Sequence, residues 1–112
     1  MNDSLSHLAE KAGQAATLLK ALSNERRLLI LCHLISAGEM TVGALVDVVG
    51  LSQSALSQHL ARLRGDGLVT FRREAQALYY RIANPDTARV IAVLRDIYCP
   101  ELGSDAPEQV SR

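Results

Sequence analysis

The sequence lacks an apolar stretch long enough to cross a membrane. No apolar run exceeds the five residues of Leu28–Cys32, whereas a membrane-spanning helix needs about 20. A charged and then apolar leader of the kind that directs secretion is also absent, because Met1–Ser4 is polar and Leu5–Leu22 is amphipathic. We therefore expect a cytoplasmic protein with no membrane partner.

Cysteine is scarce, and the chain has no excess of either charge. In a cytoplasmic protein the two cysteines, Cys32 and Cys99, are expected to be free thiols rather than a structural disulfide. Twelve basic residues balance twelve acidic ones. The charges are not distributed evenly along the chain, however. Between Gln53 and Arg81 there are five arginines and two acidic residues, which gives this segment a charge of +3. A local basic surface is a weak pointer to a polyanion.

Signatures of an enzyme are absent as well. The sequence has no Cys-x-x-Cys pair, no glycine-rich nucleotide loop and no general-base pair, so we expect no enzymatic activity. The 112 residues suffice for one domain. We expect residues 1–102 to form that domain and residues 103–112 to form a flexible tail.

Apolar residues at helical spacing predict five helices. The predicted helices are Leu5–Leu22, Glu25–Ser36, Val42–Val49, a fourth capped by Ser52 that runs to about Arg64, and a fifth capped by Asn84 that runs to about Tyr98. The other predicted N-caps are Thr41 and either Ser23 or Asn24. Leu68–Phe71 and Leu78–Ile82 read as strands of a hairpin, with the polar segment Arg72–Ala77 between them.

The order of these elements predicts the fold. About three residues separate the third and fourth helices, which is the spacing of a helix-turn-helix. A hairpin that follows directly makes it a winged helix. The expected fold class is therefore mainly α with a β-hairpin, a winged helix-turn-helix domain for DNA binding.

The fourth helix has the composition of a helix that reads DNA. At 100° per residue, Leu56, Leu60 and Leu63 share the face that must point to the core. The opposite face carries small hydroxyls, an amide and an arginine, which suit base edges and phosphates in a major groove. Its residues are Ser54, Ser57, Gln58, Ala61 and Arg62. Polar outward faces occur on many surface helices, so the position in the helix pair carries most of the weight.

Further candidates flank this face. Gln53 lies at the helix start, where free N–H groups hold phosphate. His59 borders the buried face and is expected to pack or to contact phosphate rather than a metal ion. The hairpin offers basic and amide side chains to the DNA backbone or minor groove. The complete candidate DNA-binding set is Thr41, Ser52, Gln53, Ser54, Ser57, Gln58, His59, Arg62, Arg72, Arg73 and Gln76.

Three segments carry a family resemblance. Leu51–Leu60 (LSQSALSQHL), Leu63–Val69 (LRGDGLV) and Leu22–Leu28 (LSNERRL) resemble the ArsR/SmtB family of winged-helix repressors. The resemblance covers about Ala16 to Pro100. It implies a homodimer, paired through the first and last helices, that binds an inverted-repeat operator in double-stranded DNA. Its two recognition helices would enter successive major grooves about 34 Å apart.

Many members of that family sense metals, yet the family's ligand patterns are missing here. Its thiolate sensors carry Cys-x-Cys in the third helix, whereas Thr41–Asp47 has no cysteine. Another class uses ligands along the last helix, where Asp86, Arg89, Val93 and Asp96 offer no histidine. We therefore expect no metal site and no cofactor. A metal- or haem-responsive sensor stays as an alternative, since Cys99-Pro100 resembles a haem-contacting dipeptide.

The cysteines resemble those of a dithiol branch of the family. In that branch a cysteine in the second helix and one at the end of the last helix form a switch within one protomer. The switch responds to sulfide-derived persulfides and, in some members, to other oxidants. The resemblance implies that Cys32 and Cys99 are the sensing pair. In the alternative, Cys32 is a small core residue, Cys99 is an incidental thiol, and the regulator acts by displacing another DNA-bound protein.

Distance and charge both constrain such a pair. Because 67 positions separate Cys32 and Cys99, a bridge between them would connect distant elements. A direct disulfide needs Cα atoms within about 7 Å, whereas inserted sulfur atoms relax that demand. Cys99 would also lie at the negative end of a helix dipole, which disfavours its thiolate. A cation would have to offset this effect, and the candidates are Arg95, Arg26 and Arg27.

Overall fold

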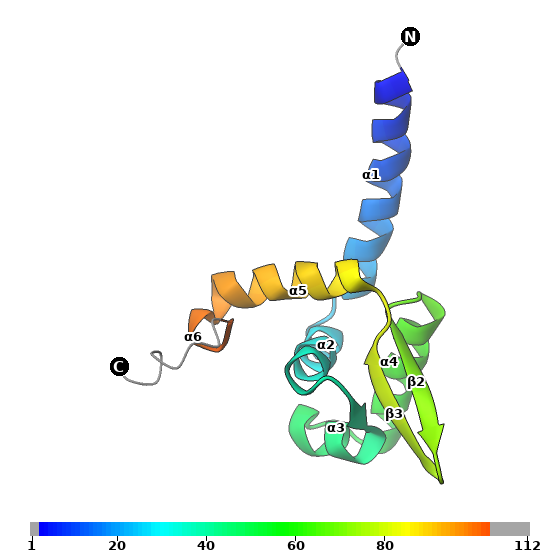
Figure 1. Ribbon diagram of the computed structural model, residues 1–112, viewed down its shortest axis with the longest axis vertical. Coiled ribbons are helices and arrows are strands. Elements are labelled where there is room, and N and C mark those ends of the chain that lie inside the picture. The colour runs from blue at the N-terminus through cyan, green and yellow to red at the C-terminus, as the bar shows by residue number, and fades with distance from the viewer. Residues whose placement is uncertain (1–2, 104–112) are drawn as a thin grey trace.

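The computed structural model describes residues 3–103 and contains the five predicted helices and the hairpin (Figure 1). In chain order the elements are α1 (Asp3–Leu22), α2 (Glu25–Ala37), β1 (Met40–Thr41), α3 (Val42–Val49), α4 (Gln53–Gly65), β2 (Val69–Glu74), β3 (Ala77–Ile82), α5 (Pro85–Tyr98) and α6 (Pro100–Gly103). The predicted helix ends are correct to within one or two residues. Of the predicted tail, Gly103 belongs to α6 and the rest lies outside the described residues.

Side-chain caps explain where four of the helices begin. Asn24, Thr41, Ser52 and Asn84 each accept a hydrogen bond from a backbone N–H in the first turn, at 3.0, 3.1, 3.1 and 2.8 Å. Each cap satisfies a donor that the helix itself leaves free. The choice between Ser23 and Asn24 is thereby decided for Asn24.

The sheet is larger than the sequence predicted. β1, β3 and β2 form one antiparallel sheet in that order, and β1 was not predicted. The predicted polar loop Arg72–Ala77 is wrong, because β2 continues to Glu74 and β3 begins at Ala77. Only Ala75 and Gln76 lie between the strands, and Ala75 adopts a positive φ of 56° to close this turn. The hairpin of β2 and β3 is the wing of the fold. The added residues of β2 are polar because they face solvent, so they lack the apolar alternation by which a strand is predicted.

The core lies where α2, α3, α4 and α5 meet beneath the sheet. Leu56, Leu60 and Leu63 of α4 are buried, as the helical projection predicted. They belong to one cluster with residues from the other three helices. That cluster includes Ile30, Leu31, Leu34, Leu45, Val49 and Ile91.

The first helix stands away from this body (Figure 1). Only its C-terminal end joins the core, through Ala21 and Leu22. Leu5 and Leu8, in its N-terminal half, are each 63% exposed. α5 extends from the body in another direction and carries α6 at its end. Within residues 3–103, none of the helices is long and apolar enough to cross a membrane.

Candidate DNA-binding surface and thiol pair

The helix pair that would meet DNA is joined by a tight turn. Gly50, Leu51 and Ser52 connect α3 to α4, which confirms the predicted three-residue spacing. Gly50 adopts a left-handed conformation with φ of 80°, and its N–H donates to the Val46 carbonyl at 3.3 Å. Glycine suits this position because a Cβ disfavours a positive φ. Ser52 then caps α4, so the turn fixes the direction in which α4 leaves α3.

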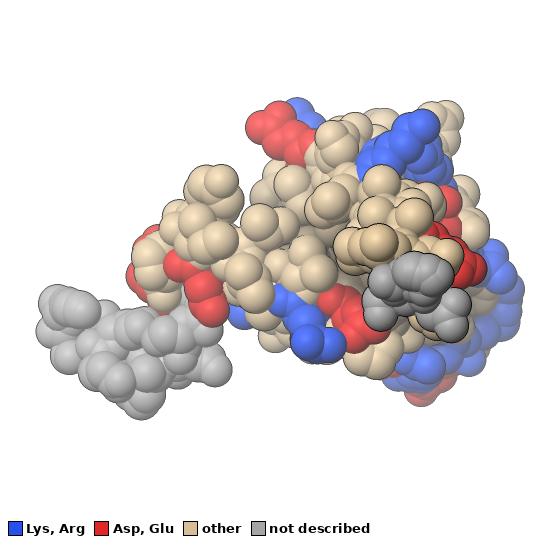
Figure 2. Space-filling model, turned by 90° about the horizontal axis from the view of Figure 1, so that it is seen from above, with Lys and Arg blue, Asp and Glu red and all other residues tan. Residues whose placement is uncertain are grey.

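The outward face of α4 is accessible, as predicted. Five side chains there are exposed: Ser54, Ser57, Gln58, Ala61 and Arg62. Ser52 and Gln53 are exposed at its start, whereas Thr41 is half-buried at the start of α3. In Figure 2 basic side chains gather on the side of the molecule where Figure 1 places α4 and the hairpin. This surface offers hydroxyl, amide and guanidinium groups without a large apolar side chain.

Two arginines of α4 have partners in the structure. Arg62 Nε contacts Asp66 Oδ2 at 3.1 Å, and both side chains remain partly exposed. Arg64 lies over the ring of Phe71 at 4.4 Å, and that ring packs against Tyr80 with centroids 5.3 Å apart. The Arg64–Phe71 contact joins α4 to β2. It is one of the contacts that hold the hairpin of β2 and β3 (the wing) against α4.

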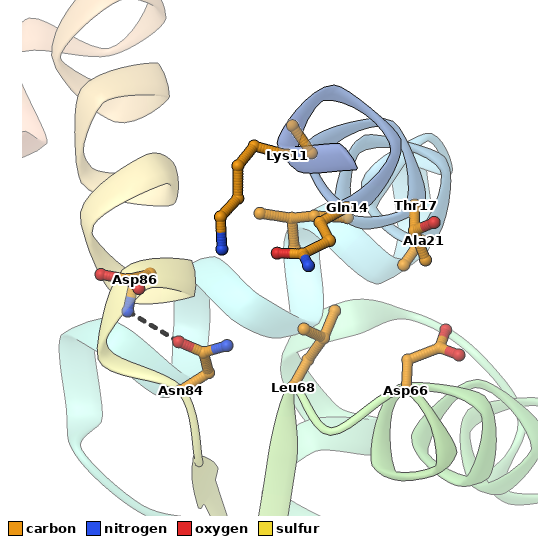
Figure 3. Close-up of a pocket in the computed structure, with 10 residues that line it drawn as sticks. Lys11, Gln14, Thr17, Ala21, Asp66, Leu68, Asn84 and Asp86 are labelled. Carbon is orange, nitrogen blue, oxygen red and sulfur yellow. Dashed lines mark hydrogen bonds between the residues drawn. The ribbon is translucent and has the colours of Figure 1, made fainter. Parts of the chain in front are cut away.

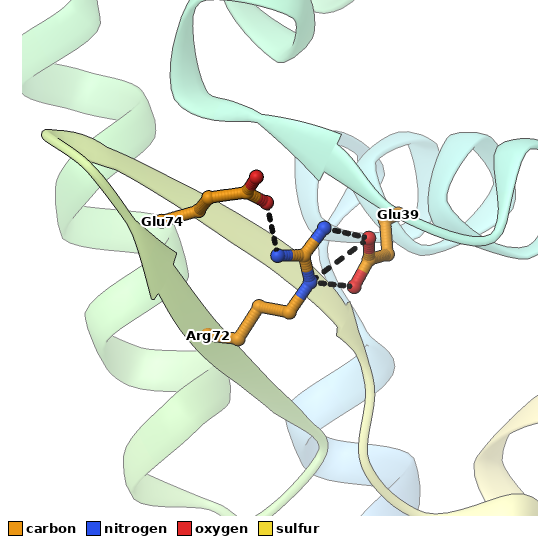
Figure 4. A network of polar contacts seen from close by, with 3 residues as sticks. All are labelled: Glu39, Arg72 and Glu74. Carbon is orange, nitrogen blue, oxygen red and sulfur yellow. Dashed lines mark hydrogen bonds and ion pairs between the residues drawn. The ribbon is translucent and has the colours of Figure 1, made fainter.

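Arg72 is engaged by two carboxylates (Figure 4). Its Nε lies 2.9 Å from Glu39 Oε2, and its Nη1 lies 2.6 Å from Glu74 Oε1. The guanidinium also stacks over the ring of Tyr79 at 4.5 Å. The hydrogen bond from Arg72 is the main cause that lowers the pKa of Glu39 below its ordinary value, so this carboxylate stays charged. In the structure, therefore, both carboxylates occupy the hydrogen-bond donors of Arg72.

The remaining candidates divide between surface and interior. Arg73 and Gln76 are exposed on the hairpin. His59 is half-buried beside the core face of α4, as predicted. Burial is the main cause that lowers its pKa, and the positive charges of Arg27 and Arg26 lower it further.

Both cysteines line one cavity between α2 and α5. Cys32 and Cys99 are free thiols and half-buried, and the cavity that they share has a volume of about 800 Å³. The other lining residues are mostly apolar: Glu25, Leu28, Leu29, Ile91, Leu94, Arg95 and Tyr98. The fold thus brings together two thiols that are distant in the sequence.

Of the three candidate cations, only Arg95 lines this cavity. Arg26 donates to the Val49 carbonyl at 3.5 Å, and Arg27 is buried and donates to the Ala21 carbonyl at 2.7 Å. Burial raises the pKa of the Cys32 thiol, the positive charge of Arg95 lowers it, and Cys99 raises it. Burial is the largest of these effects, so the net result is a raised pKa.

A second cavity, of about 530 Å³, lies between α1 and the body (Figure 3). Lys11, Gln14 and Thr17 reach it from α1, opposite Asp66 and Asn84. It contains neither thiol. Within residues 3–103, no three of the histidine, cysteine and acidic side chains lie close enough together to hold a metal ion.

The comparisons with known proteins give the family. Residues 24–70, which contain the helix-turn-helix, match the sequence profile of the arsR family of bacterial regulatory proteins. The HTH-type transcriptional regulator YgaV of Escherichia coli K12 is 48% identical over 96 residues, which cover 86% of this chain and 97% of YgaV. The chain belongs to the ArsR family.

Solved structures agree with this assignment. The transcriptional regulator HlyU from Vibrio vulnificus CMCP6 matches with a TM-score of 0.81 and 49% identity, over 86% of this chain and 99% of HlyU. The transcriptional repressor BigR from Xylella fastidiosa matches with a TM-score of 0.77 and 35% identity, over 86% of this chain and 94% of BigR. This ArsR-family protein is therefore a winged-helix, DNA-binding transcriptional regulator and not an enzyme.

The structure of this ArsR-family protein also contains contacts of candidate residues that the sequence did not predict. Glu39 was not a candidate, although it holds Arg72, because its strand β1 was not predicted. Ser36 was not a candidate either, yet its Oγ accepts from Arg95 Nη1 at 2.9 Å. The sequence around Glu39 gives no indication of its partner, because Arg72 lies 33 positions away.

Proposed function

We propose that this ArsR-family protein is a homodimeric repressor whose operator affinity is switched by Cys32 and Cys99. The thiols react with sulfide-derived persulfides or with other oxidants. The observation that supports the proposal is the shared cavity between α2 and α5, which both cysteines line. Since DNA is the target, the proposed place of action is the bacterial cytoplasm.

The outward face of α4 is proposed to read the operator. Its serine and glutamine side chains both donate and accept hydrogen bonds, as base edges require. Gln53 and the start of α4 would hold a phosphate, and Arg73 and Gln76 would reach the backbone or minor groove beside the wing. Thr41 and Ser52 would contribute their hydroxyl protons, because their oxygens already cap helices.

Dimerisation through α1 and α5 is supported by exposed apolar side chains on both helices. Leu5, Leu8 and Leu19 are exposed on α1, and Val93, Ile97 and Tyr98 are exposed on α5. Large apolar groups in such numbers mark a surface that another protein covers. A twofold pair of chains would place two α4 helices in successive major grooves of an inverted repeat.

The proposed chemistry begins with one thiolate and a low-molecular-weight persulfide. The thiolate attacks the outer sulfur of R–S–SH, the S–S bond of the reagent breaks, and RS⁻ leaves, so the protein carries Cys–S–SH. A second equivalent converts the other cysteine in the same way. The two persulfides then condense to a trisulfide bridge and release one molecule of H₂S.

A bridge of this kind would join α2 to the end of α5. The link would shift α5 against α2 and thereby change the spacing of the two α4 helices in the dimer. A coupling free energy of about 1–3 kcal/mol suffices for a useful response. The thiol form binds the operator, and the bridged form releases it.

Intact-mass measurement tests the thiol chemistry directly. Treatment with glutathione persulfide is expected to add sulfur to the wild type and to form a bridge within one chain. Cys32→Ser and Cys99→Ser are expected to form no such bridge. A wild-type protein that gains no mass would support the alternative, in which the cysteines are inert and the regulator displaces another DNA-bound protein.

A further inference from the structure

Arg95 is the one cation among the described residues that line the cavity. Its Nη1 donates to Ser36 Oγ at 2.9 Å, and its Nε is buried without a hydrogen-bond acceptor. Within residues 3–103, the ion pairs of the structure give it no carboxylate partner. The side chain as a whole is half-buried, and a guanidinium whose buried Nε has no acceptor is placed to receive an anion.

The position of Arg95 relates it to both thiols. It lies one helical turn before Cys99 on α5, and Ser36 lies one turn after Cys32 on α2. The hydrogen bond to Ser36 therefore holds the guanidinium against the turn of α2 that follows Cys32. The other arginine of α5, Arg89, lacks this anchor: it is exposed and pairs with Asp86 at 2.9 Å.

The surroundings of Cys32 leave Arg95 as the principal stabilising charge. Leucine and isoleucine supply four of the nine residues of the cavity wall, so a nearby charge acts in a less polar medium than water. Cys32 lies in the interior of α2, beyond the first turn where a helix dipole helps an anion. The other titratable groups of the wall are Glu25, about 10 Å along α2, Tyr98 on α5, and Cys99, which caps the C-terminus of α5.

We propose that Arg95, anchored by Ser36, makes Cys32 the attacking thiol and stabilises the persulfide anion that forms there. This inference rests on the proposed function and names the residue that determines which of the two thiols reacts first. Arg95 is a positioning residue, because it acts through the Cys32 sulfur. Cys99 is then the second thiol, which reacts after Cys32 and completes the bridge.

The balance of charge follows from this assignment. Cys32 loses its proton to water, and the thiolate pairs with the guanidinium. The thiolate attacks the outer sulfur of the persulfide, RS⁻ leaves and takes up a proton, and Cys32–S–SH ionises to Cys32–S–S⁻ beside Arg95. The same cation thus accompanies the anion before and after sulfur transfer. Arg95 also lowers the pKa of Cys32 against the effect of burial.

The test measures Cys32 alone, without DNA. In a Cys99→Ser background, the rate of alkylation by iodoacetamide is followed against pH for the parent, Arg95→Gln, Arg95→Lys and Arg89→Gln. We expect Arg95→Gln to move the profile to higher pH and to slow alkylation at pH 7 by roughly five- to tenfold. Arg95→Lys should restore most of the rate, and Arg89→Gln should match the parent.

Equal profiles for Arg95→Gln and the parent would overturn the inference, as would an equal shift in Arg89→Gln. If circular dichroism shows that Arg95→Gln is unfolded, Ser36→Ala takes its place, with a slowing of about two- to threefold expected from the loosened guanidinium. An unchanged rate in Ser36→Ala would then refute the assignment. If Arg95 dependence holds but persulfide leaves operator binding unchanged, the proposed sensor function fails and the role of Arg95 stands.

Discussion

Glu39 and Arg72 join the end of α2 to the wing through three contacts of 2.9, 3.0 and 3.3 Å between guanidinium nitrogens and carboxylate oxygens. Three residues before Glu39, Ser36 accepts the hydrogen bond from Arg95 of α5. One short segment, Ser36–Glu39, therefore contacts the thiol cavity's cation at one end and the wing at the other. In the proposed switch, this segment connects the movement of α5 against α2 to the wing.

Replacing Glu39 by glutamine should release Arg72 toward DNA. The amide keeps the shape of the side chain but removes the charge that competes with phosphate. We expect tighter binding to all DNA sequences, by about three- to tenfold at low salt, and a salt dependence steeper by about one charge. Fluorescence anisotropy against salt concentration measures both quantities. Asp86→Asn removes an equal charge on α5, and equal effects of the two variants would contradict the role of Glu39.

Replacing Gln58 by alanine should reduce sequence discrimination. The amide of Gln58 is exposed on the outward face of α4 and suits bidentate contact with a base. We expect operator binding to weaken by about 1–3 kcal/mol, with little change on random DNA. Gln14→Ala on exposed α1 is the control and should change neither affinity. Equal losses on operator and random DNA would show that Gln58 does not read bases.

Replacing Leu8 by glutamate should break the dimer. Leu8 is 63% exposed on α1, on the surface proposed to meet the partner chain. A buried charge without a partner is costly, so the dimer dissociation constant should rise about a hundredfold or more. Sedimentation equilibrium measures the association. Val48→Glu changes an exposed apolar residue of α3 outside that surface, and the same loss of dimer there would refute the assignment.

Acidification should destabilise the fold through His59. Its pKa in the folded protein lies below the ordinary 6.5, chiefly because of burial and then because of Arg27 and Arg26. Above pH 6.5 the imidazole is neutral in the folded and in the unfolded protein, and its contribution to the free energy of unfolding is fully present. As pH falls below 6.5, the unfolded chain binds the proton first, so stability declines. Urea unfolding at pH 7.5 and 5.5 should show a smaller decline in His59→Gln, and an identical decline would contradict this account.

Local chemistry made much of the fold predictable. Helix starts are predictable from N-cap residues, because each cap accepts a hydrogen bond from the turn that follows it. The caps here are Asn24, Thr41, Ser52 and Asn84. The burial of α4 follows from the spacing of its leucines. The two-residue strand β1 could not be predicted in this way, since its pairing with β3 depends on residues almost 40 positions apart.

The candidate site was likewise predictable where it depends on local spacing and not where it depends on contacts between distant residues. The exposed face of α4 and the role of His59 as its border follow from helical periodicity. The partners of Arg72 and Arg95 do not, because Glu39 and Ser36 lie 33 and 59 positions away in the sequence. Side chains that meet across elements leave no periodic signal in one chain.

Operator binding with and without persulfide tests the central claim most directly. The affinity of the wild type, Cys32→Ser and Cys99→Ser for the operator is measured before and after treatment with glutathione persulfide, and the thiols are then analysed by mass spectrometry. We predict that all three bind equally well when reduced, and that only the wild type forms a bridge and loses affinity, by about five- to 150-fold. A wild type that forms the bridge and still binds, or a serine variant that is released, would contradict the account.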